Sequence, residues 1–297
     1  MSVKAEWIAV DWGTSHLRVW AIQDTRAVGE ARSDKGMGRL ARSEFQDALL
    51  ELAGGWLDDA PVDVIACGMV GARQGWVEAP YATVPVAPLS GAPIRVPQTD
   101  PRIRAYVVPG LKQLKPTDVM RGEETQIAGF LALNKDWDGV ICLPGTHSKW
   151  VHVSAGEVVS FQTFMTGEMF DLLSKTSVLR HSVGDGWYDD AFREAVETTL
   201  SKPESVAARL FGIRASDLLE ATEGAVSRAR LSGLLIGAEL AAARPYWLGQ
   251  QIALIGASGM SEIYAKALEL QGVPATVADG QHMTLAGLNA ARKLLEH

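Results

Sequence analysis

The sequence predicts a two-lobed α/β protein built from a duplicated unit around a central cleft. A strand, a tight turn and two further strands occupy residues 7–32, and the same succession returns at residues 140–164. In each half, short β-branched runs then alternate with amphipathic helices, a pattern typical of parallel strands covered by helices. We expect residues 1–134 to form the N-terminal lobe and residues 135–297 the C-terminal lobe, with the two turns on opposite sides of the cleft.

The first half predicts antiparallel strands at the start, then a helix, then buried strands. Ser43 is the expected N-cap of the first helix, which ends at Gly54. A Gly- and Pro-rich segment, residues 68–101, is expected to form an ordered loop with short strands that covers a site. The expected elements are Trp7–Asp11, Leu17–Gln23, Ala27–Arg32, the helix from Ser43, Val62–Cys67, Tyr106–Val108 and a helix over Glu123–Leu133.

The second half repeats this start and is then mostly helical. Its apolar β-branched runs predict strands, and its 3.6-residue periodicity predicts helices. The expected strands are Val140–Leu143, Lys149–Val153, Val158–Phe164, Ile252–Ile255 and Ala275–Val277. The expected helices are Gly167–Leu179, Tyr188–Leu200, Pro203–Phe211, Ala215–Ala243, one ending at Gln271 and one from His282.

Composition and charge exclude several classes of protein. The 297 residues carry a net charge of −7 and a pI of about 5.4, which argues against general binding to nucleic acids or anionic membranes. No secretory signal is visible, and the most apolar long stretch, residues 231–243, contains Glu239 and is too short to span a bilayer. Cys67 and Cys142 lie in strand-like runs and are interpreted as buried, reduced thiols. We therefore expect a cytoplasmic protein.

The first turn combines a carboxylate with small and hydroxyl-bearing residues. Asp11 ends the first strand, and Gly13, Thr14 and Ser15 form the turn. Backbone N–H groups in such a turn can surround phosphate oxygens, while the carboxylate faces a hydrated divalent cation. An ordinary hairpin, in which Asp and Thr bond to backbone groups, explains these residues equally well.

The second turn has the composition of an opposing phosphate cradle. Gly145, Thr146, His147 and Ser148 follow a buried strand and combine close backbone approach with hydroxyl donors. Lys149 either reaches phosphate or points into solvent. His147 is interpreted as a hydrogen-bonding loop residue, since no partner stands at metal-ligand spacing. No Walker-type phosphate-binding sequence is present, which disfavours that class of ATPase.

A third group of small residues follows the last buried strand of the second half. Gly256, Ala257, Ser258 and Gly259 stand between that strand and a helix. Small residues at this position allow a purine or ribose to approach the backbone, and the helix start supplies N–H donors. An ordinary strand-to-helix turn is the alternative interpretation.

Together, these segments resemble the motifs of a known superfamily. Asp11-Trp12-Gly13-Thr14-Ser15, Gly145-Thr146-His147-Ser148 and Gly256-Ala257-Ser258-Gly259 are similar to the phosphate-1, phosphate-2 and adenosine motifs of the acetate and sugar kinase, Hsp70 and actin superfamily. The resemblance implies a duplicated ribonuclease-H-like (actin-like ATPase) fold, ATP as ligand and Asp11 on the side of Mg²⁺. The second motif of that superfamily usually begins with an acidic residue, whereas Leu143 or Pro144 stands there here. A second carboxylate facing the cation is therefore in doubt.

Longer segments resemble one family more closely. Residues 68–76, 121–126 and 143–150 are similar to the 2-dehydro-3-deoxygalactonokinase family. The resemblance implies phosphorylation of 2-keto-3-deoxygalactonate by ATP and Mg²⁺ at its terminal hydroxyl, which yields the 6-phosphate and ADP in galactonate breakdown. The implied ligands are a small sugar acid and ATP, with no nucleic acid or membrane partner, and a homodimer is left open.

Three carboxylates are candidates for the catalytic base. A base is expected to orient the attacking hydroxyl and take its proton. Glu123 and Glu124 match a Gly-x-Glu-Glu-like segment of related exopolyphosphatases, whereas Asp118 matches the Asp that precedes the corresponding helix in hexokinase-like members. A purely structural role, in which the two glutamates complement the helix dipole, is the alternative.

The substrate implied by the resemblance carries a carboxylate, which arginine recognises well. Arg39, Arg73 and Arg121 stand in Gly-rich segments, and Met69 lies in the same family-like segment as Arg73. Each is a candidate substrate-binding residue.

Two other functions remain open at this point. The Glu-Glu segment is compatible with an exopolyphosphatase-like phosphohydrolase, in which water is the nucleophile. A nucleotide-gated scaffold without catalytic activity is the third hypothesis, since actin-like relatives act in this way.

Overall fold

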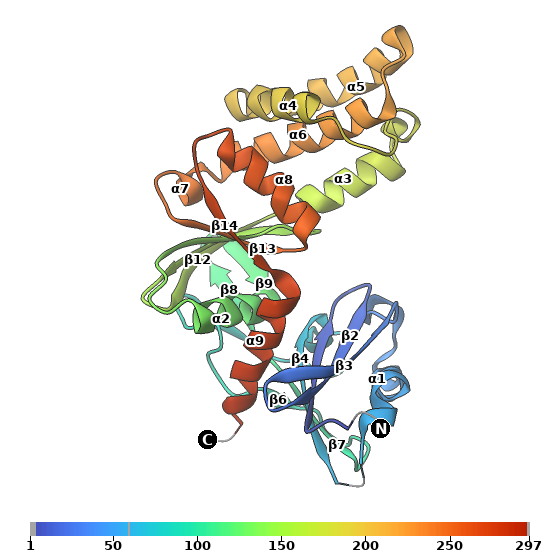
Figure 1. Cartoon of the computed structure of the whole chain (residues 1–297), viewed down its shortest axis with the longest axis vertical. Coiled ribbons are helices and arrows are strands. Elements are labelled where there is room, and N and C mark those ends of the chain that lie inside the picture. Colours follow the sequence, from blue (N-terminus) through green and yellow to red (C-terminus); the bar gives the residue numbers. More distant parts are fainter. Residues whose placement is uncertain (1–3, 59, 296–297) are drawn as a thin grey trace. The chain divides into compact units, whose positions relative to one another are not determined.

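The computed structural model describes residues 4–58 and 60–295 (Figure 1). Within this part, the chain divides into two compact units. Of the described residues, 4–58, 60–137, 154–160 and 280–295 belong to unit 1, and 138–153 and 161–279 belong to unit 2. Each lobe predicted from the sequence was one continuous stretch, with the border after residue 134. The return of residues 280–295 to unit 1 was not predicted.

The sheet of unit 1 has the strand order β3-β2-β1-β4-β7-β6. Strands β1, β4 and β7 are mutually parallel, whereas β2 and β3 continue the sheet in antiparallel fashion. The bounds are β1 Trp7–Trp12, β2 Leu17–Gln23, β3 Arg26–Ser33, β4 Val62–Gly68, β6 Ile94–Arg95 and β7 Ile103–Val107. The strands predicted at residues 7–11, 17–23, 27–32 and 62–67 are confirmed to within one residue, whereas the strand predicted at residues 106–108 begins earlier and runs over residues 103–107.

Helices cover both faces of this sheet. On one face, α1 (Phe45–Ala53) buries Phe45 and Leu49 against Val10 and Trp12 of β1. On the other, α9 (Gly280–Lys293) buries Leu288 and Ala291 in a cluster with Trp7, Trp20 and Ile65. Ser43 is not the N-cap of α1, because a 3₁₀ turn over Arg42–Glu44 precedes the helix and the Glu44 side chain accepts the Ala41 N–H.

Helix α9 positions α2 (Glu123–Leu133) through direct backbone contact. A Cβ atom on Gly129 would lie 1.9 Å from the Met283 carbonyl oxygen, and one on Gly287 would lie 1.9 Å from the Thr125 carbonyl oxygen. Gln126 also donates a hydrogen bond to the Thr284 hydroxyl at 3.2 Å. The start of α2 is therefore located by the C-terminal helix, far away in sequence.

Replacing Gly287 by Ala is expected to destabilise the protein by about 1–3 kcal/mol, because the new methyl group overpacks this contact and displaces α2. The melting temperature should fall, and turnover should fall with it since α2 carries the candidate carboxylates. Gly54→Ala is the matched control, because a Cβ at Gly54 meets no atom within 4 Å. Equal melting temperatures for the two variants would contradict this packing argument.

A small sheet accompanies the Gly- and Pro-rich segment of unit 1. Its order is β5-β8-β9, with β5 Tyr81–Thr83, β8 Gly110–Leu114 and β9 Thr117–Met120. The β8–β9 hairpin was not predicted. Its signal was present in the sequence, since Lys115-Pro116 separates two short alternating runs.

The sheet of unit 2 has the order β12-β11-β10-β13-β14, which repeats the first five positions of the sheet of unit 1. Strands β10, β13 and β14 are parallel, and β11 is antiparallel to β10. The bounds are β10 Gly139–Leu143, β11 Ser148–Ser154, β12 Glu157–Phe164, β13 Ile252–Gly256 and β14 Ala275–Asp279. The duplicated ribonuclease-H-like α/β fold predicted from the sequence is confirmed.

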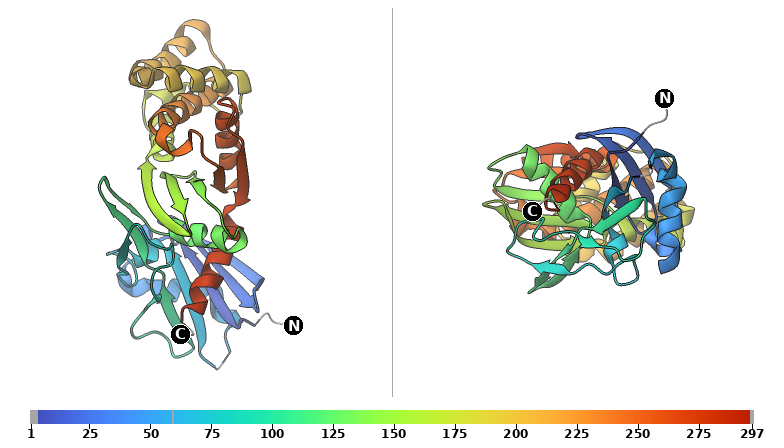
Figure 2. Two further views of the ribbon diagram at one scale, coloured as in Figure 1. Left: turned by 90° about the vertical axis from the view of Figure 1, so that its left-hand side faces the viewer. Right: turned by 90° about the horizontal axis from the view of Figure 1, so that it is seen from below.

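Unit 2 also contains a group of helices to one side of its sheet (Figures 1 and 2). The predicted helix boundary at residues 211–215 is wrong: α5 runs through Gly212 to Glu220, and Ala221, whose φ is +54°, caps its end. Gly212 costs about 1 kcal/mol in a helix interior, and burial of Ile213 beside it offsets that cost. The bounds are α3 Thr166–Lys175, α4 Asp189–Ser201, α5 Val206–Glu220, α6 Gly224–Ala242, α7 Arg244–Trp247 and α8 Ser258–Glu269.

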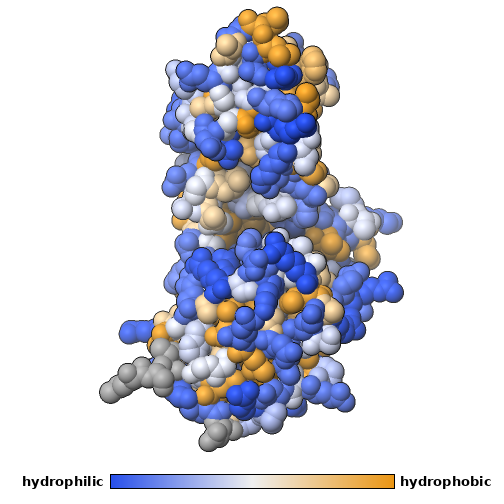
Figure 3. Space-filling view, turned by 90° about the vertical axis from the view of Figure 1, so that its right-hand side faces the viewer, coloured by the Kyte–Doolittle hydropathy of each residue, from blue (hydrophilic) through white to orange (hydrophobic). Residues whose placement is uncertain are grey.

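The surface of this helical group is partly apolar. Figure 3 shows hydrophobic side chains at the top of the view. Among the exposed apolar residues of the helical group are Leu218 and Leu219 of α5, which are 64% and 84% exposed. Within residues 4–58 and 60–295, no helix combines the length and apolar character needed to cross a membrane.

Candidate active site

In unit 1, the end of β1 and the end of β4 meet the start of α2. Asp11 pairs in register with Cys67, and Trp12 with Gly68. Gly68 has a φ of +92°, and a Cβ there would lie 2.7 Å from the Trp12 carbonyl oxygen. Gly122, with a φ of +109°, brings α2 so close that its own Cβ would lie 3.2 Å from Gly68 Cα. Two glycines thus allow α2 to begin directly on the end of the sheet.

The two adjacent glutamates at the start of α2 differ sharply in exposure. Glu124 is fully buried, and its carboxylate accepts the Gly122 N–H at 2.7 Å and the Thr125 hydroxyl at 3.0 Å. Burial, followed by the charge of Glu123, raises the pKa of Glu124 to about 7. Glu123 is only partly buried, and its carboxylate accepts the Arg121 N–H at 3.1 Å. Of this pair, Glu123 is the carboxylate that a ligand can reach.

Asp11 lies in the same electrostatic environment. Its carboxylate pairs with Arg18 of β2 at 2.7 Å, and its side chain is 16% exposed. Burial raises the pKa of Asp11, the Arg18 guanidinium opposes that shift, and the charge of Glu123 adds to it. Asp11 and Glu123 are therefore near enough to repel one another, and a cation between them would relieve that repulsion.

The first turn is held by a second loop of unit 1. Met37 donates its N–H to the Gly13 carbonyl and Gly38 to the Thr14 carbonyl, at 3.0 and 2.9 Å. A Cβ on Gly36 would lie 2.3 Å from the Thr14 carbonyl oxygen, so this close approach requires glycine. Thr14 and Ser15 are exposed at the tip of the turn.

The candidate substrate-binding residues of unit 1 lie in three different environments. Arg121 is only 8% exposed; its guanidinium donates to the Ala79 carbonyl at 2.8 Å and stacks on the Tyr81 ring at 4.2 Å. It therefore ties the loop to the start of α2, although its Nη1 has no hydrogen-bond partner within the described ranges. Arg39 pairs with Asp34 on the surface, Arg73 is exposed, and Met69 directly follows Gly68.

Asp118 lies in β9 of the small sheet, whereas Asp11 lies in β1 and Glu123 and Glu124 lie at the start of α2. It pairs in register with Gln113 of β8, one position from the hairpin turn. Its carboxylate accepts the Val119 N–H at 2.7 Å.

In unit 2, the second turn lies against the start of α3. Glu168 donates its N–H to the Thr146 carbonyl at 2.9 Å, and a Cβ on Gly167 would lie 2.2 Å from the Gly145 carbonyl oxygen. His147 bonds to the Glu168 carboxylate at 2.7 Å, so the expected loop role of this histidine is confirmed. The N–H groups of residues 145–147 have no hydrogen-bond partner in the part of the chain that the structure describes. They are therefore free to bind an anion.

Ser148 and Lys149 differ from Thr146 and His147, because both are buried. The Ser148 hydroxyl bonds to the Tyr264 hydroxyl at 2.8 Å, and Ser148 has no exposed surface. Lys149 is 4% exposed, so the interpretation that it points into solvent is wrong. Its place opposite Leu143 in the β10–β11 ladder explains this burial.

The third group of small residues adjoins the second turn within unit 2. Gly256 ends β13, Ala257 precedes α8, and Ser258 and Gly259 form the first turn of that helix. A Cβ on Gly256 would lie 3.3 Å from the Pro144 carbonyl oxygen. The second and third motifs therefore lie beside one another at the ends of β10 and β13.

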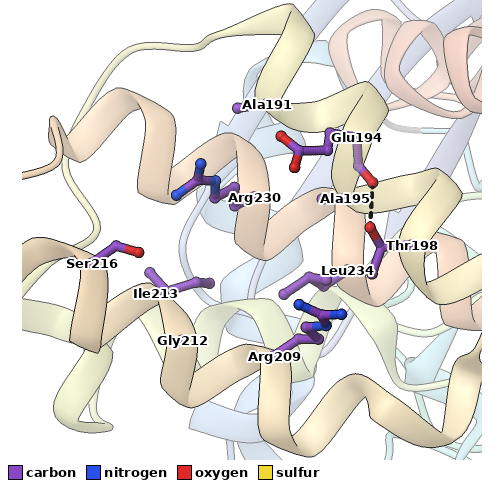
Figure 4. A pocket seen from close by; sticks show the side chains of 10 residues that line it. All are labelled: Ala191, Glu194, Ala195, Thr198, Arg209, Gly212, Ile213, Ser216, Arg230 and Leu234. Atoms are coloured by element: carbon purple, nitrogen blue, oxygen red, sulfur yellow. Dashed lines mark hydrogen bonds between the residues drawn. The ribbon is translucent and has the colours of Figure 1, made fainter.

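A pocket of about 240 Å³ opens elsewhere in unit 2, between α4, α5 and α6 (Figure 4). Arg209 and Arg230 line it, and the Thr198 hydroxyl beside them donates to the Glu194 carbonyl at 2.7 Å. None of the residues predicted for the site contributes to its wall in the described chain. The pocket is thus unrelated to the motifs.

Comparisons with known proteins agree with these motifs. A family model described as 2-keto-3-deoxy-galactonokinase matches residues 11–291. A curated relative from Rhizobium meliloti (strain 1021), named "Probable 2-dehydro-3-deoxygalactonokinase DgoK1", is 39% identical over 99% of this chain and 99% of its own. The 2-dehydro-3-deoxygalactonokinase of Escherichia coli (strain K12) is 34% identical over 96% of this chain and 97% of its own.

A solved structure from Sinorhizobium meliloti, described as a 2-dehydro-3-deoxygalactonokinase protein, has 39% identity and a TM-score of 0.89. The aligned region covers 97% of this chain and 99% of the chain in that structure. The likeness thus extends over both units and includes all three motifs. The chain belongs to the 2-keto-3-deoxy-galactonokinase family.

Proposed function

We propose that this protein transfers the γ-phosphoryl group of ATP to the terminal hydroxyl of 2-keto-3-deoxygalactonate, giving the 6-phosphate and ADP. Membership of the family supports the reaction and the substrate. The observation that carries the mechanism is the close approach of the start of α2, at Gly122, to Gly68 at the end of β4, next to the Asp11 carboxylate. Ligands of open α/β sheets bind at this edge.

Glu123 is the base in this proposal. It is the partly exposed carboxylate of the pair, and Arg121 holds it by a backbone N–H. A carboxylate placed there accepts the proton of the sugar hydroxyl as that oxygen bonds to phosphorus. Glu124 is sealed from any ligand by its burial, and Asp118 lies in a separate hairpin.

Glu124 acts on the reaction through Glu123. Its carboxylate holds the first turn of α2, and each of the two charges raises the energy of the other. Glu124 is therefore a positioning residue, whereas Glu123 touches the substrate.

Asp11 fits Mg²⁺, because carboxylate oxygens are the ligands that this ion prefers and Mg²⁺ commonly binds through one or two carboxylates plus phosphates. Within the described ranges, no group of three or more Asp, Glu, His or Cys side chains forms an all-protein metal site, so ATP and water would complete the shell. Bound there, the ion would neutralise charge on the phosphate oxygens. Arg18 holds the Asp11 carboxylate in place.

Replacing Asp11 by Asn is expected to raise the Mg²⁺ concentration for half-maximal turnover by at least about tenfold, because an amide binds the cation more weakly. A Mg²⁺ titration at saturating ATP and sugar acid measures this. Asp34→Asn is the control, because Asp34 is an exposed carboxylate paired with Arg39. An unchanged Mg²⁺ requirement in the Asp11 variant would remove Asp11 from the metal site.

The motifs of both units supply the nucleotide contacts in this proposal. Gly13, Thr14 and Ser15 face phosphate in unit 1, and the free N–H groups of residues 145–147 do so in unit 2. The turn from Gly256 to Gly259 and the start of α8 receive adenosine. Lys149 supports the second turn from its buried position.

For the sugar acid, Arg121 is buried like Glu124, so it supports the pocket through Ala79 and Tyr81 rather than by direct contact, and Met69 lies in the chain segment after Gly68. Arg39 and Arg73 are exposed and available. This assignment predicts that arginine variants raise the KM for the sugar acid rather than for ATP.

A coupled assay of ADP release tests the function. ATP consumption should require both 2-keto-3-deoxygalactonate and Mg²⁺, and a panel of epimeric 2-keto-3-deoxy acids should show which stereochemistry is preferred. Degradation of polyphosphate without any response to sugar acids would instead support the phosphohydrolase. Nucleotide binding without turnover of either substrate would support the scaffold.

We also propose that the protein is cytoplasmic and forms a homodimer. The acidic composition supports the first. The exposed Leu218 and Leu219 of α5 would suit a contact between copies. Sedimentation at several protein concentrations measures the oligomeric state.

A further inference from the structure

A buried carboxylate of unit 2 lies at the centre of a hydrogen-bond network that the proposed reaction does not use. Glu239, on α6, is 3% exposed. Its Oε1 accepts the Trp150 indole N–H at 2.8 Å, and its Oε2 accepts the Tyr264 hydroxyl at 2.7 Å. The Thr166 side chain bonds to the same carboxylate. Removing a carboxylate from water costs free energy, and the several hydrogen bonds that Glu239 accepts offset that cost.

The hydrogen bonds to the Glu239 carboxylate have a defined direction. The indole N–H can only donate, and an ionised carboxylate can only accept. Tyr264 donates to Glu239, and the Ser148 hydroxyl lies 2.8 Å from the Tyr264 hydroxyl and also bonds to the Glu239 carboxylate. Ser148, Tyr264 and Glu239 thus form a closed group in which the carboxylate is the shared acceptor.

This network changes the role of Ser148. Its hydroxyl is taken up by Tyr264 and Glu239, and the residue has no exposed surface. Ser148 therefore does not donate its hydroxyl to a phosphate, as its place in the second motif suggested. It contributes by fixing the backbone of the turn that precedes it.

The partners of Glu239 come from the segments around that turn. Ser148 and Trp150 belong to β11, which begins directly after residues 145–147. Thr166 begins α3, whose next residue contacts the turn. Tyr264 belongs to α8, which starts after the third motif. One carboxylate thus joins three segments that converge on the second and third motifs.

We propose that Glu239 is a positioning residue for nucleotide binding, which holds the turn at residues 145–147 and the start of α8 in register through Tyr264, Ser148 and Trp150. The inference rests on the proposed function, since it assumes that these two turns receive ATP. It goes beyond that function by assigning a role to three buried side chains that touch no substrate.

The test measures ATP binding and kinetics in the full-length protein. Tyr264→Phe removes the hydroxyl that bonds to both Ser148 and Glu239 while the ring stays in place. It is expected to weaken ATP binding by about three- to tenfold, which matches the loss of one hydrogen bond, with the KM of the sugar acid unchanged. Calorimetry gives the dissociation constant of ATP, and initial rates give both KM values.

A double-mutant cycle shows whether Tyr264 acts through Ser148. Ser148→Ala should weaken ATP binding to a similar extent, and the double variant should bind ATP no more weakly than the weaker single variant. Additive losses would mean that the two residues act separately and would overturn the link between Ser148 and Tyr264.

Glu239→Gln provides a second, isosteric variant should Tyr264→Phe fold poorly. The Gln amide group must point its NH₂ at one of the two donors Trp150 and Tyr264, which breaks that bond of the network. The same selective loss of ATP affinity is expected. Thr199→Val is the matched control, because the buried Thr199 hydroxyl bonds to the Leu234 carbonyl between α4 and α6, and its loss should lower stability alone.

Several outcomes would reject the proposal. If Tyr264→Phe and Glu239→Gln bind ATP as the unchanged protein does, Glu239 is a core polar group without a role in binding. The same holds if both KM values rise together and in parallel with lost stability, as general loosening would produce. If the unchanged protein itself binds no ATP, the proposed function fails first, and this inference with it.

Discussion

Replacing Glu123 by Gln is expected to lower kcat by about 10²-fold or more, with the KM of the sugar acid nearly unchanged. The amide keeps the shape of the side chain and its bond to the Arg121 N–H, but it takes no proton from the attacking hydroxyl. Steady-state rates against both substrates, with a fluorescence or calorimetric measurement of sugar binding, separate loss of chemistry from loss of binding.

Two variants make this result specific to Glu123. Asp118→Asn, in the separate β8–β9 hairpin, should keep kcat within about threefold, which corresponds to less than about 1 kcal/mol of barrier. Glu124→Gln should lose less activity than Glu123→Gln because Glu124 is sealed from ligands. Full activity of the Glu123 variant, combined with an inactive Asp118 or Glu124 variant, would move the base to that other residue.

Replacing Glu124 by Gln is expected to stabilise the protein at alkaline pH. Burial raises the pKa of Glu124 from 4.5 to about 7 in the folded state. Because the folded pKa lies above the unfolded one, the stabilising contribution of this carboxyl is fully present below pH 4.5 and is lost as the pH rises through 7. The amide introduced by Glu124→Gln carries no charge at any pH, so the variant should be more stable above pH 7 by at most about 3 kcal/mol.

The geometry of the site accommodates this amide. Its oxygen can accept the Gly122 N–H, and its NH₂ can donate to the Thr125 hydroxyl oxygen. Melting temperatures at pH 5 and pH 8.5 measure the effect: a difference between the variant and the unchanged protein should appear at pH 8.5 and be small at pH 5. Glu220→Gln, on the exposed end of α5, is the control and should show no such pH dependence. Loss of stability at pH 8.5 in the Glu124 variant would show that the charged form is the one the fold requires.

Together, the kcat of the Glu123 variant and the stability of the Glu124 variant would show that these two adjacent residues have different roles, one in activity and the other in stability. Glu123 and Glu124 are adjacent, yet one is reachable and the other is enclosed because the helix start turns between them. Gly68 and Gly122 create that enclosure by letting α2 begin on the end of β4. Burial of the Glu124 charge lowers the stability of the protein, whereas the accessible Glu123 carboxylate takes part in the proposed reaction.

Local sequence patterns were sufficient for most of the secondary structure of both sheets. The alternation in residues 17–23, the β-branched run at 62–67 and the capping glycine at 54 predicted elements that the structure contains. The errors occurred where a tertiary contact outweighs local preference. Gly212 did not end α5, because Ile213 packs into the helical group, and Ser43 did not cap α1, because Glu44 bonds back to Ala41.

The sequence by itself determined the fold class, the family and the three motifs, since these depend on residue type, spacing and strand order along the chain. It did not decide which carboxylate a substrate can reach, that Lys149 is buried, or that the Ser148 hydroxyl is taken up by Tyr264 and Glu239. Those properties depend on which distant segments pack over each side chain: α9 places α2 through Gly287, and α6 brings Glu239 to β11. Burial and hydrogen-bond partners are set by neighbours that sequence spacing does not encode, so only the tertiary structure decided them.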